Sequence, residues 1–172
     1  MKTVKVLLMV ILTSGFGWID TTNAQSPQPE MTISRVVNQS ADGIWEIIRQ
    51  MDDIEQYSSV IETLKWRGPK GKGGQRICYG SDGQSYYKER IISFSDETRT
   101  YTYEMLEGVP TKGMKSTFKV VDLGFNKSMI VWYTHYDEFI DNPQMDEEQF
   151  SGFVSQTINE LIDNMTREAI KV

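Results

Sequence analysis

The sequence is poor in cysteine and histidine. Among 172 residues, Cys78 is the only cysteine and His135 the only histidine. A lone cysteine cannot form an intrachain disulfide, so burial of apolar side chains has to stabilise the fold. One cysteine and one histidine also cannot provide the four ligands of an ordinary zinc site. We therefore expect no metal and no cofactor, and we interpret Cys78 as a buried structural thiol rather than a nucleophile.

Basic side chains are also fewer than acidic ones. The chain has 18 lysines and arginines against 24 aspartates and glutamates, which gives a formal net charge of −6. Binding to nucleic acid or to anionic lipid relies on clustered positive charge that neutralises phosphate groups. The composition therefore argues against both as partners.

No apolar run at the N-terminus is long enough to span a membrane. The run Val6–Leu12 is far shorter than the roughly 18 residues that a transmembrane helix needs. Lys2 and Lys5 precede it, and small residues of the kind that signal peptidase recognises follow at positions 22–24. This order predicts a secretory signal peptide over residues 1–24 that is cleaved after Ala24. An uncleaved N-terminal anchor is the alternative.

Cleavage would leave 148 residues, enough for one domain with a substantial core. It would remove Lys2, Lys5 and Asp20 and leave 16 basic and 23 acidic side chains, a net charge of −7. Residues 25–30 contain two prolines and are interpreted as a linker, so the domain covers residues 31–172. We expect an exported monomer in the periplasm or the extracellular space, without stable membrane insertion after cleavage.

Hydrophobic spacing predicts one strand and two helices at the start of this domain. Apolar and polar residues alternate over Met31–Val37, as in a half-buried strand. Ser40 is a suitable N-cap for a helix whose apolar residues recur at three- and four-residue steps up to Met51. A second short helix is expected over Asp53–Tyr57.

A series of strands and one long helix follow. Short turn signals separate the strand patterns, which is typical of antiparallel hairpins. The predicted strands are Val60–Arg67, Gln75–Tyr79, Ser85–Phe94, Arg99–Leu106, Gly113–Asp122 and Ser128–Phe139. The helix, Glu147–Lys171, has the clearest apolar stripe in the chain and begins with an Asp146–Gln149 capping pair. At 1.5 Å per residue it is roughly 35 Å long, enough to cross a whole domain.

This order of elements predicts an α+β helix-grip fold. A curved antiparallel sheet of about seven strands has one face to bury, and the C-terminal helix is the element long enough to cover it. Two short helices follow the first strand. Because the strands are rich in aromatic side chains, we expect the sheet and the helix to enclose a largely apolar pocket. A core that these aromatics simply fill is the alternative.

Short segments in a fixed order give the chain a resemblance to a known superfamily. They are Ser40-Ala41-Asp42 with Trp45, Asp52 and Tyr57, Gly74-Gln75-Arg76, Lys88-Glu89-Arg90-Ile91, Asp96, Tyr101 and Val131-Trp132. From about Thr32 to its end the chain resembles the START-like, or SRPBCC, helix-grip superfamily. This superfamily includes polyketide cyclases and dehydrases, pollen allergens and plant abscisic acid receptors. The resemblance implies the fold but no single activity, because the fold occurs in binders, transfer proteins and enzymes alike.

The resemblance and the strand pattern both draw attention to Glu89. In similar receptors and cyclases a glutamate or another polar residue at this place lines the pocket, and a loop at the place of Gly80–Gly83 closes over the ligand. Lys88 and Arg90 share one face of their strand, so Glu89 should point inward. A buried carboxylate needs a hydrogen-bond partner or a raised pKa, and either makes it useful to a ligand. A one-residue slip in register would instead leave Glu89 in a surface ion pair.

Strand alternation and the helical stripe together assign the walls of the pocket. The predicted ligand-binding residues are Tyr87, Glu89, Ile91, Tyr101, Tyr103, Met105, Phe118, Val120, Trp132, Thr134, Tyr136, Phe150, Phe153, Val154 and Thr157. The only histidine, His135, alternates away from this face, and we interpret it as a partly exposed sheet residue rather than a general base.

Three functions are compatible with such a pocket. The first is an exported binder or carrier of a small hydrophobic molecule. The second is an enzyme of the polyketide cyclase or dehydrase type, in which Glu89 together with Tyr101, Tyr103 or Tyr136 would act as acid and base groups. The third is a protein-interaction module whose cavity is filled. No motif in the sequence identifies a catalytic constellation, so the sequence favours a binder without establishing whether the protein is an enzyme.

Overall fold

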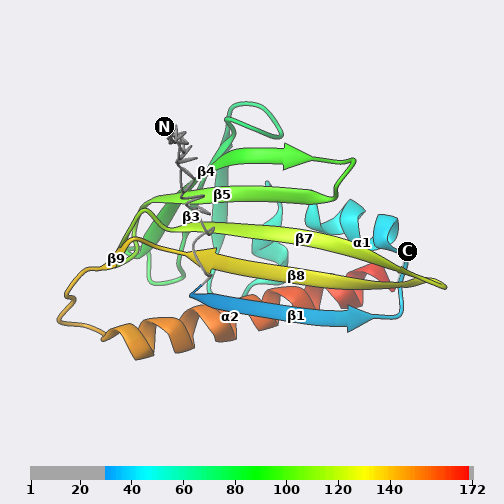
Figure 1. The fold of residues 1–172 in the computed structure, drawn as a ribbon. Coiled ribbons are helices and arrows are strands. Elements are labelled where there is room, and N and C mark those ends of the chain that lie inside the picture. Colours follow the sequence, from blue (N-terminus) through cyan, green and yellow to red (C-terminus); the bar gives the residue numbers. More distant parts are fainter. Residues whose placement is uncertain (1–29, 171–172) are drawn as a thin grey trace, which may run out of the picture.

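A seven-stranded antiparallel sheet and one long helix dominate the structure (Figure 1). The computed structural model describes residues 30–170. Its elements, in chain order, are β1 (Met31–Val37), α1 (Ala41–Ile48), η1 (Ile54–Tyr57), β2 (Thr63–Arg67), β3 (Gln75–Tyr79), β4 (Tyr86–Ser95), β5 (Thr100–Glu107), β6 (Thr111–Lys112), β7 (Lys115–Gly124), β8 (Lys127–His135), β9 (Glu138–Phe139) and α2 (Glu147–Ala169). The element η1 is a single 3-10 turn.

The strand order of the large sheet is β1-β8-β7-β5-β4-β3-β2, and every neighbouring pair is antiparallel. α2 runs along the sheet from the end near β9 to the end near α1 (Figure 1), and it contacts β1, η1 and α1. The predicted α+β helix-grip fold, with two short helical segments after the first strand, is confirmed.

Local sequence signals begin both α-helices where they are predicted. At the start of α1, the hydroxyl of Ser40 accepts a hydrogen bond from the backbone N–H of Gly43 at 3.1 Å. At the start of α2, the backbone N–H of Gln149 donates to Asp146 Oδ1 at 2.8 Å, and the backbone N–H of Asp146 donates to Gln149 Oε1 at 2.9 Å. This reciprocal capping box satisfies two donors that would otherwise lack partners. It thereby fixes the beginning of α2 immediately before Phe150.

The prediction of one strand over Ser128–Phe139 is wrong at its C-terminal end. β8 ends at His135, and β9 pairs with β6 in a separate two-stranded sheet. The backbone N–H of Asp137 donates to the carbonyl oxygen of Lys112 at 2.9 Å, which directs the chain toward β6. Strands of two residues are too short to show a hydrophobic period, so the sequence pattern cannot reveal them.

The interior contains two hydrophobic clusters of unequal size. The larger lies between the sheet, α1 and the C-terminal half of α2, and in it Trp45 packs against Phe94 with ring centroids 5.8 Å apart. The smaller lies near the beginning of α2 and consists of the buried residues Met114, Tyr136 and Phe150. Met105 and Val154 pack against both clusters. The region between the clusters is therefore bridged by these two side chains rather than filled by a continuous core.

Within residues 30–170, no helix combines the length and the apolar character needed to cross a bilayer. The predicted signal peptide, and all but the last residue of the predicted linker, lie outside the described residues.

Candidate ligand-binding site

A cavity of about 100 Å³ lies between the sheet and the N-terminal half of α2, where the two clusters meet. Its walls come from β4, β5 and β8 on one side and from α2 on the other. The lining residues are Val60, Tyr87, Glu89, Tyr103, Met105, Val109, Met114, Trp132, Phe150, Phe153, Val154, Thr157 and Ile158. Most of these side chains are apolar, and Glu89 is the one carboxyl-bearing side chain among them. A largely apolar space with a few polar groups is the usual composition of a small-ligand site.

A wider groove of about 480 Å³ adjoins this cavity. The cavity and the groove share Val60, Tyr87, Val109, Phe150 and Phe153. The rim of the groove includes the turn Gly80–Asp82 and the segment that precedes α2. This turn therefore borders the mouth, as the resemblance implies, and its closure over a ligand stays a prediction.

A close backbone approach at Gly108 shapes one side of the mouth. Gly108 has a φ of +91°, and an added Cβ would lie 2.1 Å from the carbonyl oxygen of Tyr86. Glycine is therefore required both by the left-handed backbone and by the lack of space. Val109 and Pro110, which follow directly, line the groove as a consequence of this approach.

Glu89 points into the domain, and Arg76 balances its charge. The two side chains are 5% and 3% exposed, and Arg76 Nε donates to Glu89 Oε2 from the neighbouring strand. Arg76 Nη1 also donates to the carbonyl oxygen of Met51 at 3.0 Å. The guanidinium carbon of Arg76 lies 5.1 Å from the ring centroid of Tyr103. Arg76 is thus held on three sides, and it positions the carboxylate of Glu89 at the polar end of the cavity.

The outer face of β4 confirms the alternation that places Glu89 inward. Lys88 forms an ion pair with Glu107 at 3.3 Å, and Arg90 forms one with Glu104. Hydrophobic spacing does not predict the partner of Glu89, because the pairing of Arg76 with Glu89 depends on the register of β3 against β4. The one signal in the sequence that could have indicated this partner is Arg76 itself, a basic residue at an inward position of the preceding strand.

Burial and charge act in opposite directions on Arg76. Burial alone would lower the pKa of its guanidinium, whereas the carboxylate of Glu89 raises it, and the pKa ends well above its usual value. Arg76 therefore stays charged inside the domain. Burial, and secondly the charge of Glu89, also raise the pKa of Tyr103 above its usual value. Tyr103 is consequently a hydrogen-bond donor at neutral pH and not a base.

A hydrogen bond between Trp132 and Tyr103 forms the floor of the cavity. Trp132 Nε1–H donates to Tyr103 Oη at 3.1 Å, although β7 lies between the strands that carry them. Ser116 of β7 lies opposite Tyr103 and bonds to Thr134 at 2.8 Å. Because Ser116 is small, the two large side chains can meet over it.

Nine of the fifteen residues predicted to bind a ligand line this cavity. They are Tyr87, Glu89, Tyr103, Met105, Trp132, Phe150, Phe153, Val154 and Thr157. Their contact with a ligand stays a prediction. The lining residues that the sequence pattern did not indicate are Val60, Val109, Met114 and Ile158. Val60 and Val109 lie in connections outside the strands, where no alternation indicates which way a side chain points.

The other six predicted residues face the interior but do not line this cavity. They are Ile91, Tyr101, Phe118, Val120, Thr134 and Tyr136. The first four belong to the larger hydrophobic cluster, and α1 contacts β7 and β8 in that region. Alternation predicts which face of a strand is buried, but it does not predict which part of that face a helix covers.

Of the four residues considered as acid and base groups, Glu89 and Tyr103 line the cavity, and Tyr101 and Tyr136 do not. Tyr101 is fully buried, and burial raises its pKa to about 12. Tyr136 lies in the smaller cluster and donates to Glu147 at 2.6 Å, and burial together with this hydrogen bond raises its pKa to about 12.

His135 and Cys78 both lie outside the lining of the cavity. His135 Nδ1 is 3.2 Å from a carboxylate oxygen of Glu30, and its Nε2 is 3.7 Å from one of Asp137. Cys78 is completely buried, and burial raises the pKa of its thiol to about 12, so that the thiol stays protonated. Within residues 30–170, no group of three or more histidine, cysteine, aspartate or glutamate side chains is placed to hold a metal ion.

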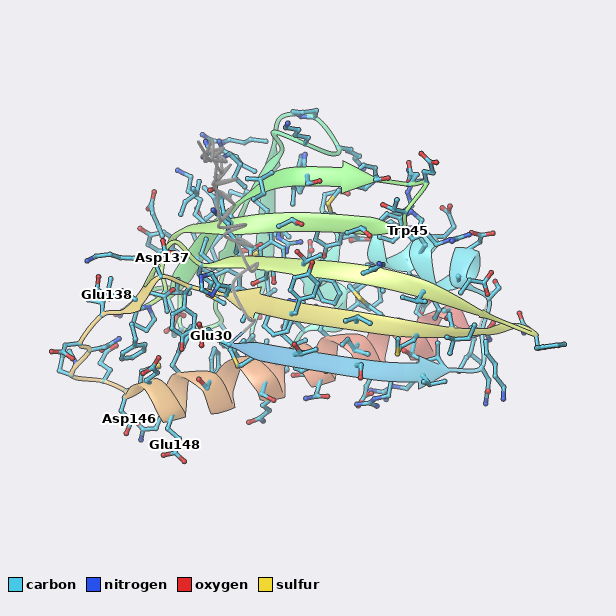
Figure 2. The ribbon with its side chains drawn as sticks, in the orientation of Figure 1. Glu30, Trp45, Asp137, Glu138, Asp146 and Glu148 are labelled. Carbon is cyan, nitrogen blue, oxygen red and sulfur yellow. The ribbon has the colours of Figure 1, made fainter. Side chains whose placement is uncertain are left out.

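Acidic side chains gather at the end of the domain where the groove opens. Figure 2 shows Asp137, Glu138, Asp146 and Glu148 at this end, whereas Trp45 lies toward the other end of the sheet. These residues belong to β9, to the connection before it and to the beginning of α2, and the segment between β9 and α2 lines the groove. Glu138 is paired with Lys112 at 2.6 Å, so the negative charge at this end is partly neutralised.

Comparison with known families agrees with this architecture. The family model described as "Polyketide cyclase / dehydrase and lipid transport" matches residues 28–169. The chain belongs to this family. The resemblance to the START-like helix-grip superfamily is thereby confirmed.

Solved structures share the fold of this polyketide cyclase/dehydrase family member at low sequence identity. XoxI from Bacillus cereus is 18% identical, over 81% of this chain and 94% of that chain, with a TM-score of 0.69. Norcoclaurine synthase from Thalictrum flavum, in complex with dopamine and hydroxybenzaldehyde, is 20% identical over 82% and 86%, with a TM-score of 0.63. The Zhui aromatase/cyclase from Streptomyces sp. R1128 is 12% identical over 82% and 93%, with a TM-score of 0.65. No curated protein sequence matches the chain significantly.

Proposed function

We propose that this protein binds and carries a small hydrophobic molecule in the cavity between the sheet and α2. The observation that carries the proposal is the mostly apolar cavity, in which the one carboxylate, that of Glu89, is balanced by Arg76. Such a site can hold an apolar molecule and orient it through a single polar group. The family description includes lipid transport, and norcoclaurine synthase holds two small aromatic molecules in the same fold. Both facts support a small molecule as the type of ligand.

A cyclase or dehydrase activity is the second candidate, because Glu89 lines the cavity and the Zhui aromatase/cyclase shares the fold. Proton transfer requires an acid or base within hydrogen-bond reach of the substrate. Glu89 is already engaged by Arg76, and Tyr101 and Tyr136 do not line the cavity. Tyr103 does line it, but burial raises the pKa of its hydroxyl, so that it can donate a proton but does not act as a base at neutral pH. This candidate predicts product formation from a polyketide substrate that Glu89→Gln abolishes. A carrier binds such molecules and releases them unchanged.

Export of the protein is part of the proposal. The basic start, the short apolar run and the small residues at 22–24 support cleavage after Ala24. Mass spectrometry of protein recovered from the periplasm or the medium should give a chain that begins at Gln25. Recovery of only the full-length chain from the cytosol would contradict export.

Native mass spectrometry tests the carrier function directly. Protein purified without detergent should retain a co-purifying apolar molecule or take one up from a lipid and polyketide panel. Thr157→Trp places a large side chain in the cavity from α2, whereas Gln156→Trp adds the same side chain at an exposed position of the same helix. We expect the first variant to lose the ligand and the second to keep it. Equal ligand occupancy in both variants, or no uptake by the native protein, would overturn the proposal.

A further inference from the structure

The polar end of the cavity brings two hydrogen-bonding side chains within reach of one small group. Glu89 and Tyr103 both line the cavity. In the pairing of β4 with β5, Glu89 lies opposite Met105 and Tyr103 lies opposite Ile91, so Glu89 and Tyr103 are diagonal neighbours on one face. Diagonal neighbours are roughly 7–8 Å apart at the backbone, and long side chains reach across this distance. A single ligand group can therefore contact both.

The hydrogen-bonding capacities of these two side chains are complementary. Arg76 donates to Oε2 of Glu89, which leaves the second carboxylate oxygen, Oε1, as an acceptor. Trp132 donates to the oxygen of Tyr103 at 3.1 Å, so the hydroxyl hydrogen of Tyr103 is left to be donated. The polar end thus offers one acceptor and one donor.

We propose that the ligand enters this end of the cavity with a neutral hydroxyl group, as in a phenol or an alcohol. The inference rests on the proposed function and specifies the class of ligand. A hydroxyl can donate to Glu89 and accept from Tyr103 at the same time. An ether or a ketone only accepts, and it would leave Oε1 of Glu89 without a donor. An ammonium group would bring a second positive charge to a carboxylate that Arg76 already balances, and burying that unbalanced charge is costly.

A carboxylate head group is disfavoured at the polar end. Inside the cavity it would face Glu89, whereas Arg76 lies behind that carboxylate and is not part of the lining. Fatty acids and aromatic acids should therefore bind more weakly than the matching alcohols and phenols.

The two connected spaces set the shape of the ligand. The inner space of about 100 Å³ is smaller than the cavity of about 150 Å³ that is known to hold benzene, so it accommodates the head group and only part of a ring or a short chain. A longer ligand has to extend into the outer groove of about 480 Å³, past Tyr87, Phe150 and Phe153. The ligand class is accordingly an amphiphile with a small hydroxylated head and an apolar tail.

Three probes that differ only in the head group test this assignment. 4-Hexylphenol donates and accepts, 4-hexylanisole only accepts, and 4-hexylbenzoate carries a negative charge. In isothermal titration calorimetry at pH 7, the phenol should bind about tenfold or more tightly than either of the others, because these leave a buried polar group unmatched. Equal or tighter binding of the anisole or the benzoate would overturn the hydroxyl assignment and leave the carrier function standing. Failure of all three to bind would overturn both.

A double variant tests whether the polar end of the cavity causes the preference for the phenol over the anisole. Arg76→Met with Glu89→Leu replaces the buried ion pair by apolar side chains of similar size, a change that often preserves folding. In this variant the advantage of the phenol over the anisole should fall to about twofold or less. The control is Arg90→Gln with Glu104→Gln, which removes the exposed pair on the outer face of β4 and β5. An undiminished preference for the phenol in the variant without Arg76 and Glu89 would overturn the role of Glu89. If that variant does not fold, the three probes on the native protein decide whether the ligand carries a hydroxyl group.

Discussion

Arg76 of β3 lies directly opposite Glu89 of β4, and their side chains form an ion pair that is almost completely buried. Removing one member of such a pair leaves an uncompensated charge in the interior, whereas removing both leaves none. The pair therefore links the stability of the domain to the polarity of its cavity. Its two roles can be separated by measuring stability and ligand binding on the same variants.

Single substitutions in this pair should be far more destabilising than the double substitution. We expect Arg76→Met to lower the free energy of unfolding by about 3–5 kcal/mol, because Glu89 is then buried without a partner. Arg76→Met combined with Glu89→Leu should cost much less. Urea denaturation of the three proteins measures these differences. Arg90→Gln, which breaks the partly exposed pair with Glu104, should cost less than about 1 kcal/mol. Additive losses in the double variant would contradict the coupling.

Gly108→Ala should destabilise the domain more than Gly83→Ala. Both glycines have positive φ, +91° and +68°, so alanine at either position costs about 1 kcal/mol of backbone strain. Only at Gly108 would the added Cβ also collide, at 2.1 Å from the carbonyl oxygen of Tyr86, whereas nothing lies within 4 Å at Gly83. The collision should cost a further ~1–3 kcal/mol. Equal denaturation midpoints for the two variants would show that the backbone at Gly108 does not pack tightly against Tyr86.

Changing the two turn residues of the hairpin between β7 and β8 should make the domain more stable. Phe125 and Asn126 have φ values of +53° and +57°, the geometry of a type I′ turn, which prefers Asn-Gly. The side chain of Phe125 is fully exposed, so its removal sacrifices no packing. Phe125→Asn with Asn126→Gly should raise the free energy of unfolding by about 1 kcal/mol in urea denaturation. Phe125→Ala keeps the strained backbone and should change stability by less than about 0.5 kcal/mol. An equal gain in both variants would refute the turn as the source of the strain.

Stability should fall at alkaline pH because of Tyr101. Burial raises its pKa from the ordinary value of 10.0 to about 12, so the unfolded chain releases this proton at a lower pH than the folded chain. The stabilising effect is complete below pH 10 and is lost as the pH rises toward 12. Over that interval this group should reduce the free energy of unfolding by about 1.4 kcal/mol per pH unit.

Tyr101→Phe removes the ionisable group, so it should reduce the slope of the free energy of unfolding against pH by about 1.4 kcal/mol per pH unit. Urea denaturation at several pH values between 10 and 12 measures the slope. Tyr133→Phe, on the exposed outer face of β8, should leave the slope as it is in the native protein. A slope that is unaffected by Tyr101→Phe would assign the alkaline loss to other groups.

The sequence predicts those parts of the fold that depend on local pattern. The apolar stripe and the capping pair of Asp146 and Gln149 are enough to predict the beginning of α2, and alternation around Glu89 is enough to predict its inward orientation. Both features depend on residues within one element. Their physical causes, hydrogen bonding at a helix end and burial of one strand face, act over a few residues.

The extent of the site depends on contacts between elements, and the sequence pattern does not contain them. Tyr101 faces inward as predicted, but it packs with Trp45 of α1 at a ring-centroid distance of 6.4 Å and not along the cavity. Arg76 meets Glu89 only because of the register between two strands. Val109 reaches the cavity because Gly108 holds the preceding backbone against β4. Each of these placements becomes visible only when the elements are assembled.

The methionine methyl groups offer the most direct test that a ligand occupies the space between the sheet and α2. Met105 and Met114 line the cavity, whereas Met165 lies in the larger cluster and Met129 on the outer side of the sheet opposite Val36. In NMR spectra of protein labelled with methyl-13C methionine, saturating 4-hexylphenol should shift the signals of Met105 and Met114 and leave those of Met129 and Met165 in place. Unchanged signals of Met105 and Met114 under conditions of demonstrated binding would contradict the account, because the ligand would then lie elsewhere.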